Sequence, residues 1–387
     1  MGCIGVGAYG SVYKCRDLIS NKIVACKVIW RCLEDACTTK QVVREIHSLL
    51  ALRGHPNIVH LCDVVLPESP KTGLNVCLVF DYVETDLHKI LHSDQALGMD
   101  HVVFIIYQLL MAVAYSHKRG IIHRDMKPAN ILITEKVEIR LADYGMSRVI
   151  GEAPVSPAGI TLQPLQRQLT QKVVTRWYRA PEIILKLEYG PPVDMWSLGC
   201  ILGELLLTML HKGTRSHGGC MAVFQGGSCF PLSKDRHYKN DADYVNDQLA
   251  VILQNLGMTH PPGGTPDPRL KDLRVKDERD QAYIHEMATF RGPRVSIFDS
   301  LTVAGVDPLA VKLLRGCLEL DPAKRLTAQD ALRSPLFDLF PVRDVDLEEE
   351  MIKTATRLAD PDPLLTLPLT PGEMLSNLKK DVVNPHE

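Results

Sequence analysis

The stretch His-Arg-Asp-Met-Lys-Pro-Ala-Asn at residues 123–130 constrains this chain more than any other part of its sequence. Asp125 can accept a proton from a hydroxyl group or orient that group, and Lys127 adds a positive charge close by. Asn130 and, further along, Asp143 offer the hard oxygen ligands that Mg²⁺ prefers. The proline inside the stretch disfavours a helix, so we expect a loop. A base, a cation and two oxygen ligands together indicate phosphoryl transfer, which depends on positioning and charge stabilisation.

Any one of these residues alone would fit a charged surface loop. The complete string, followed by Asp-Tyr-Gly at 143–145, resembles the catalytic loop and metal-binding motif of protein kinases. The resemblance implies that Asp125 orients a substrate hydroxyl, that Lys127 stabilises the moving phosphoryl group, and that Asn130 and Asp143 hold Mg²⁺. Tyr144 replaces the usual phenylalanine and adds a hydroxyl group that needs a partner or water. We expect metal binding by Asp143 to survive this change.

A glycine-rich turn near the start of the chain would let the backbone approach a phosphate closely. Its pattern, Gly-x-Gly-x-x-Gly, also occurs in dinucleotide-binding folds, but strand-like residues follow it here rather than a helix. The kinase resemblance implies that this segment covers ATP with Ile4, Gly5, Val6, Gly7, Ala8, Tyr9, Gly10 and Val12. Because so few residues precede the glycines, we expect the first strand to be truncated, or else a naturally short edge.

Lys27 lies in the apolar segment 24–29, where a lysine is costly to bury unless it is paired. It could face solvent on an alternating strand. The kinase-like alternative places it on the ATP phosphates and requires an acidic partner on the next helix. We expect that helix at 39–53, capped by Thr38 or Thr39 and ended by Gly54, with Glu45 as the partner of Lys27.

Residues 76–80 indicate a buried strand, followed by a hinge at 81–84. The resemblance places Phe80 at the back of the adenine pocket and gives adenine the backbone of Asp81 and Val83, although core packing explains Phe80 nearly as well. Asp86 could approach the ribose or cap a helix. A long, mostly buried helix is expected at 100–118.

The change from strands to helices at this point predicts an α+β, bilobed protein kinase fold. We expect a kinase domain over 1–338, with a small β-rich N-lobe at 1–80, the hinge at 81–84 and a larger α-helical C-lobe at 85–338. A C-terminal extension would occupy 339–387. In the large lobe, the resemblance implies that Asp194 holds the catalytic-loop backbone and that Glu182 pairs with Arg325. An ordinary helix-capping role is the alternative for Asp194.

Residues 169–182 resemble the activation segment of the CMGC kinases, the group of mitogen-activated and cyclin-dependent kinases. The segments 84–87 and 193–204 are more similar to mitogen-activated kinases. The chain carries Thr-Gln-Lys at 170–172 where those enzymes have Thr-x-Tyr, which suggests an atypical branch. Phosphorylation of Thr170 alone would then switch the enzyme by joining three arginines, Arg44, Arg124 and Arg148.

The same resemblance implies a proline-directed Ser/Thr kinase that uses ATP and Mg²⁺. Thr175 would hydrogen-bond to Asp125 and Lys127, and Arg176 and Arg179 would line the pocket for the proline after the target residue. Two alternatives stay open. One is a pseudokinase or scaffold that binds partners without efficient transfer, and the other is an enzyme closer to the cyclin-dependent kinases.

Composition limits the partners. The net charge of -2 gives no bulk attraction to nucleic acid, and the longest apolar run, 102–115, is too short to span a membrane. Eleven cysteines without a Cys-x-x-Cys pair favour reduced thiols over disulfides or a zinc site, so a cytoplasmic or also nuclear protein is expected. Segment 211–240 reads as an insertion. The acidic run at 344–350 could dock basic motifs of substrates and of an upstream kinase, or be a solvated face.

Overall fold

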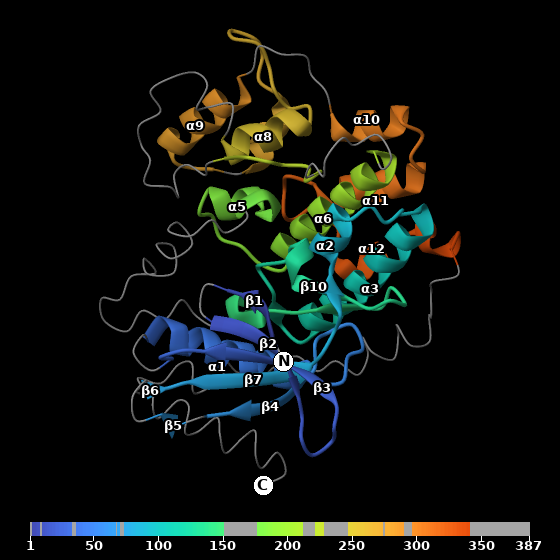
Figure 1. The fold of residues 1–387 in the computed structure, drawn as a ribbon. Coiled ribbons are helices and arrows are strands. Elements are labelled where there is room, and N and C mark those ends of the chain that lie inside the picture. The colour runs from blue at the N-terminus through green and yellow to red at the C-terminus, as the bar shows by residue number, and fades with distance from the viewer. Residues whose placement is uncertain are drawn as a thin grey trace.

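The computed structural model describes residues 2–7, 10–32, 36–66, 68–69, 73–150, 176–211, 221–227, 247–273, 275–289 and 296–340. The expectations for Ala8, Tyr9, Thr170, Thr175 and the acidic run at 344–350 lie outside these residues, as does most of 211–240. A small sheet with one long helix, drawn in blue, lies below a larger helical part (Figure 1). The bilobed α+β architecture expected from the sequence is therefore present.

The small lobe is built on a five-stranded antiparallel sheet with the order β1-β2-β3-β7-β4. Its strands are β1 (Gly2–Val6), β2 (Gly10–Arg16), β3 (Ile23–Ile29), β7 (Val76–Asp81) and β4 (Leu61–Val65). Strand β1 is longer than we expected from the sequence because it continues into the first residues of the glycine-rich segment. Two short strands, β5 (Glu68–Ser69) and β6 (Gly73–Leu74), form a separate hairpin.

Helix α1 (Ala36–Ala51) packs its apolar stripe into the core, where Val43 and Ile46 are fully buried. The helix begins earlier than predicted, so Thr38 and Thr39 lie within it and the predicted cap is wrong. The hydroxyl of Thr39 donates instead to the carbonyl of Cys32, just before the helix. At the other end, Gly54 has a φ of +93°, which suits glycine and closes the turn that follows the helix.

Short strands connect the two lobes and frame the loop at 123–130. Strands β8 (Thr85–Asp86), β10 (Ile131–Ile133) and β11 (Ile139–Leu141) form one small sheet, and β9 (Ile121–Ile122) pairs with β12 (Arg148–Val149). Between them lie two 3₁₀ turns, η1 (Pro128–Asn130) and η2 (Tyr144–Met146). Pro128 therefore begins a turn of 3₁₀ helix rather than an irregular loop. A proline fits there because the first residue of a helix needs no N–H partner.

Helices make up most of the large lobe. They are α2 (Leu87–His92), α3 (Met99–Lys118), α5 (Pro181–Ile184), α6 (Pro192–His211), α8 (Gln248–Asn255), α9 (Glu278–Ala288), α10 (Ile297–Val303), α11 (Pro308–Cys317) and α12 (Ala328–Leu332), with the 3₁₀ turns η3 (Arg176–Tyr178), η4 (Pro268–Leu273) and η5 (Pro335–Asp338).

Helices α3 and α6 form the centre of this lobe (Figure 1). Both are long and apolar enough to cross a membrane, but 78% and 83% of their most apolar windows are buried inside the fold, as in core helices. Trp196 of α6 is fully buried and stacks on Phe224 with a centroid distance of 5.6 Å. The two helices therefore provide a rigid base for the residues at 123–130.

A buried ion pair connects two distant parts of the large lobe. Arg325 donates to both carboxylate oxygens of Glu182 at 2.7 and 3.1 Å, and both side chains are buried. The pair expected from the sequence is therefore present. Removing one partner would leave an uncompensated buried charge, at a cost of about 3–5 kcal/mol.

Candidate active site

Lys27 lies between two carboxylates, one from each lobe. Its ammonium group contacts both oxygens of Glu45 on α1, at 2.7 and 2.9 Å, and Oδ1 of Asp143 at 3.0 Å. Burial lowers the pKa of Lys27, but the charges of Asp143 and Glu45 outweigh it and raise the pKa overall. The ion pair expected between Lys27 and Glu45 is present, and Lys27 is not a solvent-facing residue of an alternating strand.

Asp143 is held in its ionised form. The nearby ammonium of Lys27 is the main cause that lowers the pKa of Asp143 to about 2, against the opposing effect of burial. The residue adopts a left-handed backbone conformation with a φ of +66°. Such a conformation is strained for a residue with a side chain and persists only where the surroundings enforce it.

The turn at 123–130 gathers two of the predicted side chains, Lys127 and Asn130, around Asp125. The ammonium of Lys127 donates to Oδ2 of Asp125 at 2.7 Å. The amide of Asn130 donates to the carbonyl of Asp125 at 2.8 Å and to its Oδ2 at 3.2 Å. These contacts leave Oδ1 of Asp125 without a hydrogen bond among the described residues, so that oxygen can accept a proton from an incoming group.

Asp194 holds the backbone of this turn from below. Its two carboxylate oxygens accept hydrogen bonds from the N–H groups of His123 and Arg124, each at 2.8 Å, and the ring of His117 lies 2.8 Å from Oδ2. Burial tends to raise the pKa of Asp194, but its bond to His117 and the nearby histidine charges lower it overall. Asp194 is therefore a support for the turn and not only a helix-capping acid.

Tyr144 packs underneath the same turn. Its side chain is fully buried, its ring meets that of His123 edge-on at 4.6 Å, and its hydroxyl lies 3.1 Å from Oγ of Ser116 on α3. The hydroxyl partner that a tyrosine requires at this position is thus provided by α3. This arrangement fixes the residue next to Asp143.

Asn130 and Asp143 suit a hard divalent cation. The Nδ2 atom of Asn130 is committed to Asp125, which leaves the amide oxygen available as a ligand. The carboxylate of Asp143 is ionised, and 46% of its side chain remains exposed. An amide oxygen and a carboxylate in an open position are a donor set that Mg²⁺ accepts.

The glycine-rich turn adjoins this site. One of its glycines closes the turn by a backbone hydrogen bond, and another is required by the close approach of two strands. The N–H of Gly7 donates to the carbonyl of Gly10 at 2.8 Å. A Cβ atom on Gly10 would lie 2.0 Å from the carbonyl oxygen of Val28 on β3. Gly10 is therefore required by the close approach of β2 to β3. Of the apolar residues assigned to this segment, Ile4 and Val6 are exposed, and Val12 lies opposite Lys27 in the β2–β3 pair.

The end of β7 and the residues after it form the connection between the lobes. Phe80 and Val83 are buried. Asp86 caps α2 by accepting a hydrogen bond from the N–H of Lys89 at 3.0 Å, which is the helix-cap alternative for this residue. The side chain of Asp81 points toward His60, Cys62 and Arg140.

Comparison with known proteins agrees with this geometry. Residues 1–337 match the family model described as "Protein kinase domain". The chain belongs to the protein kinase family. It is 34% identical over 348 residues to mitogen-activated protein kinase 15 of Mus musculus, covering 90% of this chain and 54% of that protein.

Two further relatives are covered over more of their length. Identity is 34% with extracellular signal-regulated kinase 2 of Dictyostelium discoideum, over 87% of this chain and 78% of that protein. It is 32% with mitogen-activated protein kinase 6 of Arabidopsis thaliana, over 86% and 70%. These relatives agree with the CMGC, mitogen-activated-kinase-like resemblance of the sequence. The chain spans just over half the length of the first curated relatives that it matches.

Two of the three arginines assigned to the kinase switch meet at one tyrosine. Arg124 donates to the hydroxyl of Tyr189 at 2.6 Å, and the guanidinium groups of Arg124 and Arg148 lie 5.9 and 5.6 Å from the centre of its ring. Burial raises the pKa of Tyr189, but the two cations outweigh it and lower the pKa overall. Arg44 lies half-buried on α1.

Two of the residues assigned to the proline pocket, Arg176 and Arg179, lie at the start of the described segment 176–211. Arg176 donates to the carbonyl of Gly227 at 2.8 Å, and Trp177 donates to that of Gly226 at 3.1 Å. Arg179 is half-buried just before α5. These bonds fix the 3₁₀ turn η3 against segment 221–227 of the kinase.

Sequence reasoning missed three residues that support the site, namely Ser116, His117 and Tyr189. Ser116 and His117 are polar positions near the end of a mostly apolar helix, which was the available signal. Tyr189 has no comparable signal, because its role depends on two arginines that come from other segments of the kinase.

Proposed function

We propose that this protein is a Ser/Thr protein kinase that transfers the γ-phosphoryl group of ATP to a protein hydroxyl. The observation that carries the proposal is the pair of neighbouring constellations in one site. Lys27 lies between Glu45 and Asp143, and Asp125 lies between Lys127 and Asn130. One group positions phosphates, and the other positions the acceptor.

In this mechanism, Asp125 accepts the hydroxyl proton through Oδ1 and aims the oxygen at the γ-phosphorus. Lys127 lies 2.7 Å from the other oxygen of Asp125. From there its positive charge would stabilise the negative charge that develops on the phosphoryl group. Lys27 holds the α- and β-phosphates, and Glu45 keeps the lysine in place. Mg²⁺, held by Asn130 and Asp143, would supply charge neutralisation for the phosphates.

The test is transfer of labelled phosphate from ATP to a Ser-Pro peptide by the purified full chain. Asp125→Asn should reduce the rate by about 10²–10⁴-fold, the usual contribution of an acid–base residue. Asp63→Asn, a change at an exposed carboxylate of β4, is the matched control and should retain the rate. ATP binding without transfer in the unmodified protein would contradict the enzyme proposal and favour a scaffold.

We further propose that the kinase is proline-directed and is switched by phosphorylation of Thr170. Support comes from the mitogen-activated relatives and from Arg124 and Arg148, two cations that meet at Tyr189. A peptide with Ser-Ala in place of Ser-Pro should be a poorer substrate. Thr170→Ala should abolish activation by an upstream kinase, and undiminished activation in this variant would rule out the switch.

The partners proposed from the same resemblance are proteins with Ser/Thr-Pro sites and an upstream activating kinase. The acidic run at 344–350 would dock basic motifs of these partners, in the cytoplasm and also in the nucleus. Replacing its carboxylates by amides should weaken binding of a basic docking peptide while leaving the phosphorylation rate of a short peptide unchanged.

A further inference from the structure

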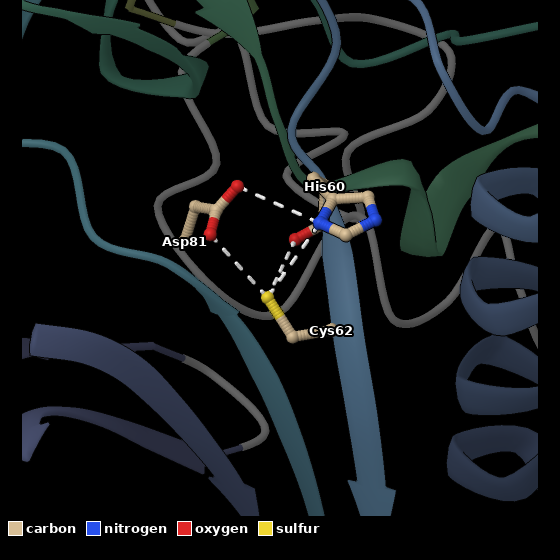
Figure 2. Close-up of side chains that lie close together, drawn as sticks. All are labelled: His60, Cys62 and Asp81. Carbon is tan, nitrogen blue, oxygen red and sulfur yellow. Dashed lines mark hydrogen bonds and ion pairs between the residues drawn. The ribbon is translucent and has the colours of Figure 1, made fainter. Parts of the chain in front are cut away.

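A mixed cluster of a histidine, a cysteine and an aspartate lies at the edge of the small-lobe sheet, where β7 leads into the hinge. His60 directly precedes β4, Cys62 lies within β4, and Asp81 ends the neighbouring strand β7. Figure 2 shows the three side chains pointing toward one another from these two segments. None of the steps proposed for phosphoryl transfer uses these side chains.

The backbone brings the three residues together. The N–H of Asp81 donates to the carbonyl of His60 at 3.3 Å. The β4–β7 register shifts between Leu61 and Asp63, so Cys62 occupies a β-bulge. Bulges redirect a side chain at the edge of a sheet and often occur next to functional sites. Here the bulge places the thiol of Cys62 beside the carboxylate of Asp81.

The ligand atoms of the three side chains lie at separations close to those of a zinc site. The Sγ atom of Cys62 lies 3.6 Å from Nδ1 of His60 and 3.5 Å from Oδ1 of Asp81, while Nδ1 lies 3.5 Å from the other carboxylate oxygen, Oδ2. With one ligand atom from each residue, the three atoms lie within 4.8 Å of one another, so a rotation of the Asp81 carboxylate would bring one oxygen to both partners. With ordinary zinc–ligand bond lengths, a tetrahedral ion separates a sulfur from a nitrogen or oxygen by about 3.5 Å, and a nitrogen from an oxygen by about 3.3 Å. The cluster therefore needs little rearrangement to bind a metal ion.

The chemistry of the three groups selects the metal. Thiolate and imidazole ligands favour Zn²⁺ over Mg²⁺, so the site would not compete for the cation that accompanies ATP. The side chains of His60 and Asp81 are 40% and 47% exposed, which leaves access for the ion and room for water as a fourth ligand.

Two features of the cluster oppose binding. Arg140 donates to Oδ2 of Asp81 at 3.3 Å and places a competing positive charge next to the site. Burial and the charge of Asp81 raise the pKa of Cys62 to about 11, so the incoming ion must displace the thiol proton to solvent. Removing the positive charge of Arg140 should therefore raise the affinity for the ion.

We propose that His60, Cys62 and Asp81 bind one Zn²⁺ ion, with water as the fourth ligand. The ion would join the start of β4 to the hinge end of β7. This proposal is independent of the kinase proposal, because it concerns a separate set of side chains and its test measures metal binding rather than phosphate transfer. The absence of a Cys-x-x-Cys pair does not oppose it, since the ligands are a His-x-Cys pair and an aspartate from the next strand.

The experiment is a titration of the metal-free full chain with Zn²⁺ in competition with a chromophoric chelator. Loss of a side chain that hydrogen-bonds to a metal ligand commonly lowers metal affinity by about 10–100-fold. Cys62→Ser and His60→Gln each remove a direct ligand, so each should lower the affinity for Zn²⁺ by at least about 100-fold. Cys3→Ser, at an exposed thiol, is the matched control and should retain the affinity.

Two further measurements test the assignment. Arg140→Gln should tighten Zn²⁺ binding by roughly tenfold, since it removes a neighbouring positive charge. Co²⁺ bound to the unmodified protein should show visible d–d bands and a thiolate-to-cobalt charge-transfer band that is lost in Cys62→Ser. The proposal would be overturned if Cys62→Ser and His60→Gln bound zinc as tightly as the unmodified chain does. It would also be overturned if the unmodified chain bound no zinc.

Discussion

The positive charge of Lys27 is more than balanced by its neighbours, because this one cation contacts two carboxylates. The contacts of 2.7 Å to Glu45 and 3.0 Å to Asp143 leave this part of the site with an excess of one negative charge. That excess suits a divalent cation, which would turn the balance positive and allow anionic phosphates to approach. The charge arrangement therefore explains why a lysine is stable there before any nucleotide binds.

Tyr144 permits a test of what its additional hydroxyl contributes. Tyr144→Phe keeps the ring but removes the bond to Ser116, whose hydroxyl retains its bond to the carbonyl of Ala112 at 2.9 Å. We expect a loss of about 1 kcal/mol in the free energy of unfolding in urea, the usual value for one hydrogen bond. Tyr144→Ala, which also removes the ring, should cost about 3–5 kcal/mol. Equal losses in the two variants would mean that the hydroxyl, not the ring, fixes this residue.

The residues that we assign to the substrate form a recognisable sequence pattern, because phosphoryl transfer requires particular groups at short spacing. Asp125, Lys127 and Asn130 lie within one turn of chain, so a local pattern contains them. The residues that support them come from elsewhere. Tyr189 and His117 could not be assigned, since each acts on a group that is distant in the sequence.

At the scale of elements, α1 illustrates what periodicity can and cannot predict. Its apolar stripe identified the helix and placed Glu45 correctly, because the stripe must face the core. Its start was misplaced because two threonines resembled caps, whereas Thr39 is bound to Cys32. The sequence shows that a residue can cap a helix, but tertiary contacts decide where the helix begins.

The loop after α1 contains a buried histidine that should make stability depend on pH. His55 is 4% exposed, Nδ1 accepts a hydrogen bond from the N–H of Asn57, and Nε2 has no partner among the described residues. Burial lowers the pKa of His55 to about 4, from about 6.5 in an unfolded chain. Between these values the unfolded state binds more protons, so stability should fall as the pH falls through this window.

Protonation of His55 should lower the free energy of unfolding by about 2 kcal/mol between pH 7 and pH 5. Urea unfolding at both pH values measures this loss. Comparison with His55→Gln subtracts the contribution of the other titrating groups. Glutamine keeps an acceptor for the N–H of Asn57 but does not titrate. The variant should lose about 2 kcal/mol less than the unmodified chain over this interval. Identical pH dependence in both proteins would show that His55 is protonated without cost.

At the scale of the whole molecule, the two lobes share one continuous apolar core and are also joined by charged and polar contacts. Lys27 reaches Asp143 across the lobes, and Ser48 on α1 lies 2.8 Å from Ser147 after η2. The division into a β-rich and an α-rich part could be predicted, because strand and helix patterns differ along the chain. The contacts between the lobes could not, since they join residues that no local pattern relates.

ATP with Mg²⁺ should therefore stabilise the whole molecule through both lobes. A ligand that binds the folded state alone adds about 2.7 kcal/mol at a free concentration of 100 times its Kd, because it shifts the folding equilibrium by mass action. Thermal unfolding with ATP should give a higher Tm in the presence of Mg²⁺ than in EDTA. Asp143→Asn removes a ligand charge and should abolish this difference, while Asp63→Asn should retain it. A metal-dependent rise that survives Asp143→Asn would mean that Mg²⁺ is held elsewhere, and the assignment of Asn130 and Asp143 as its ligands would be wrong.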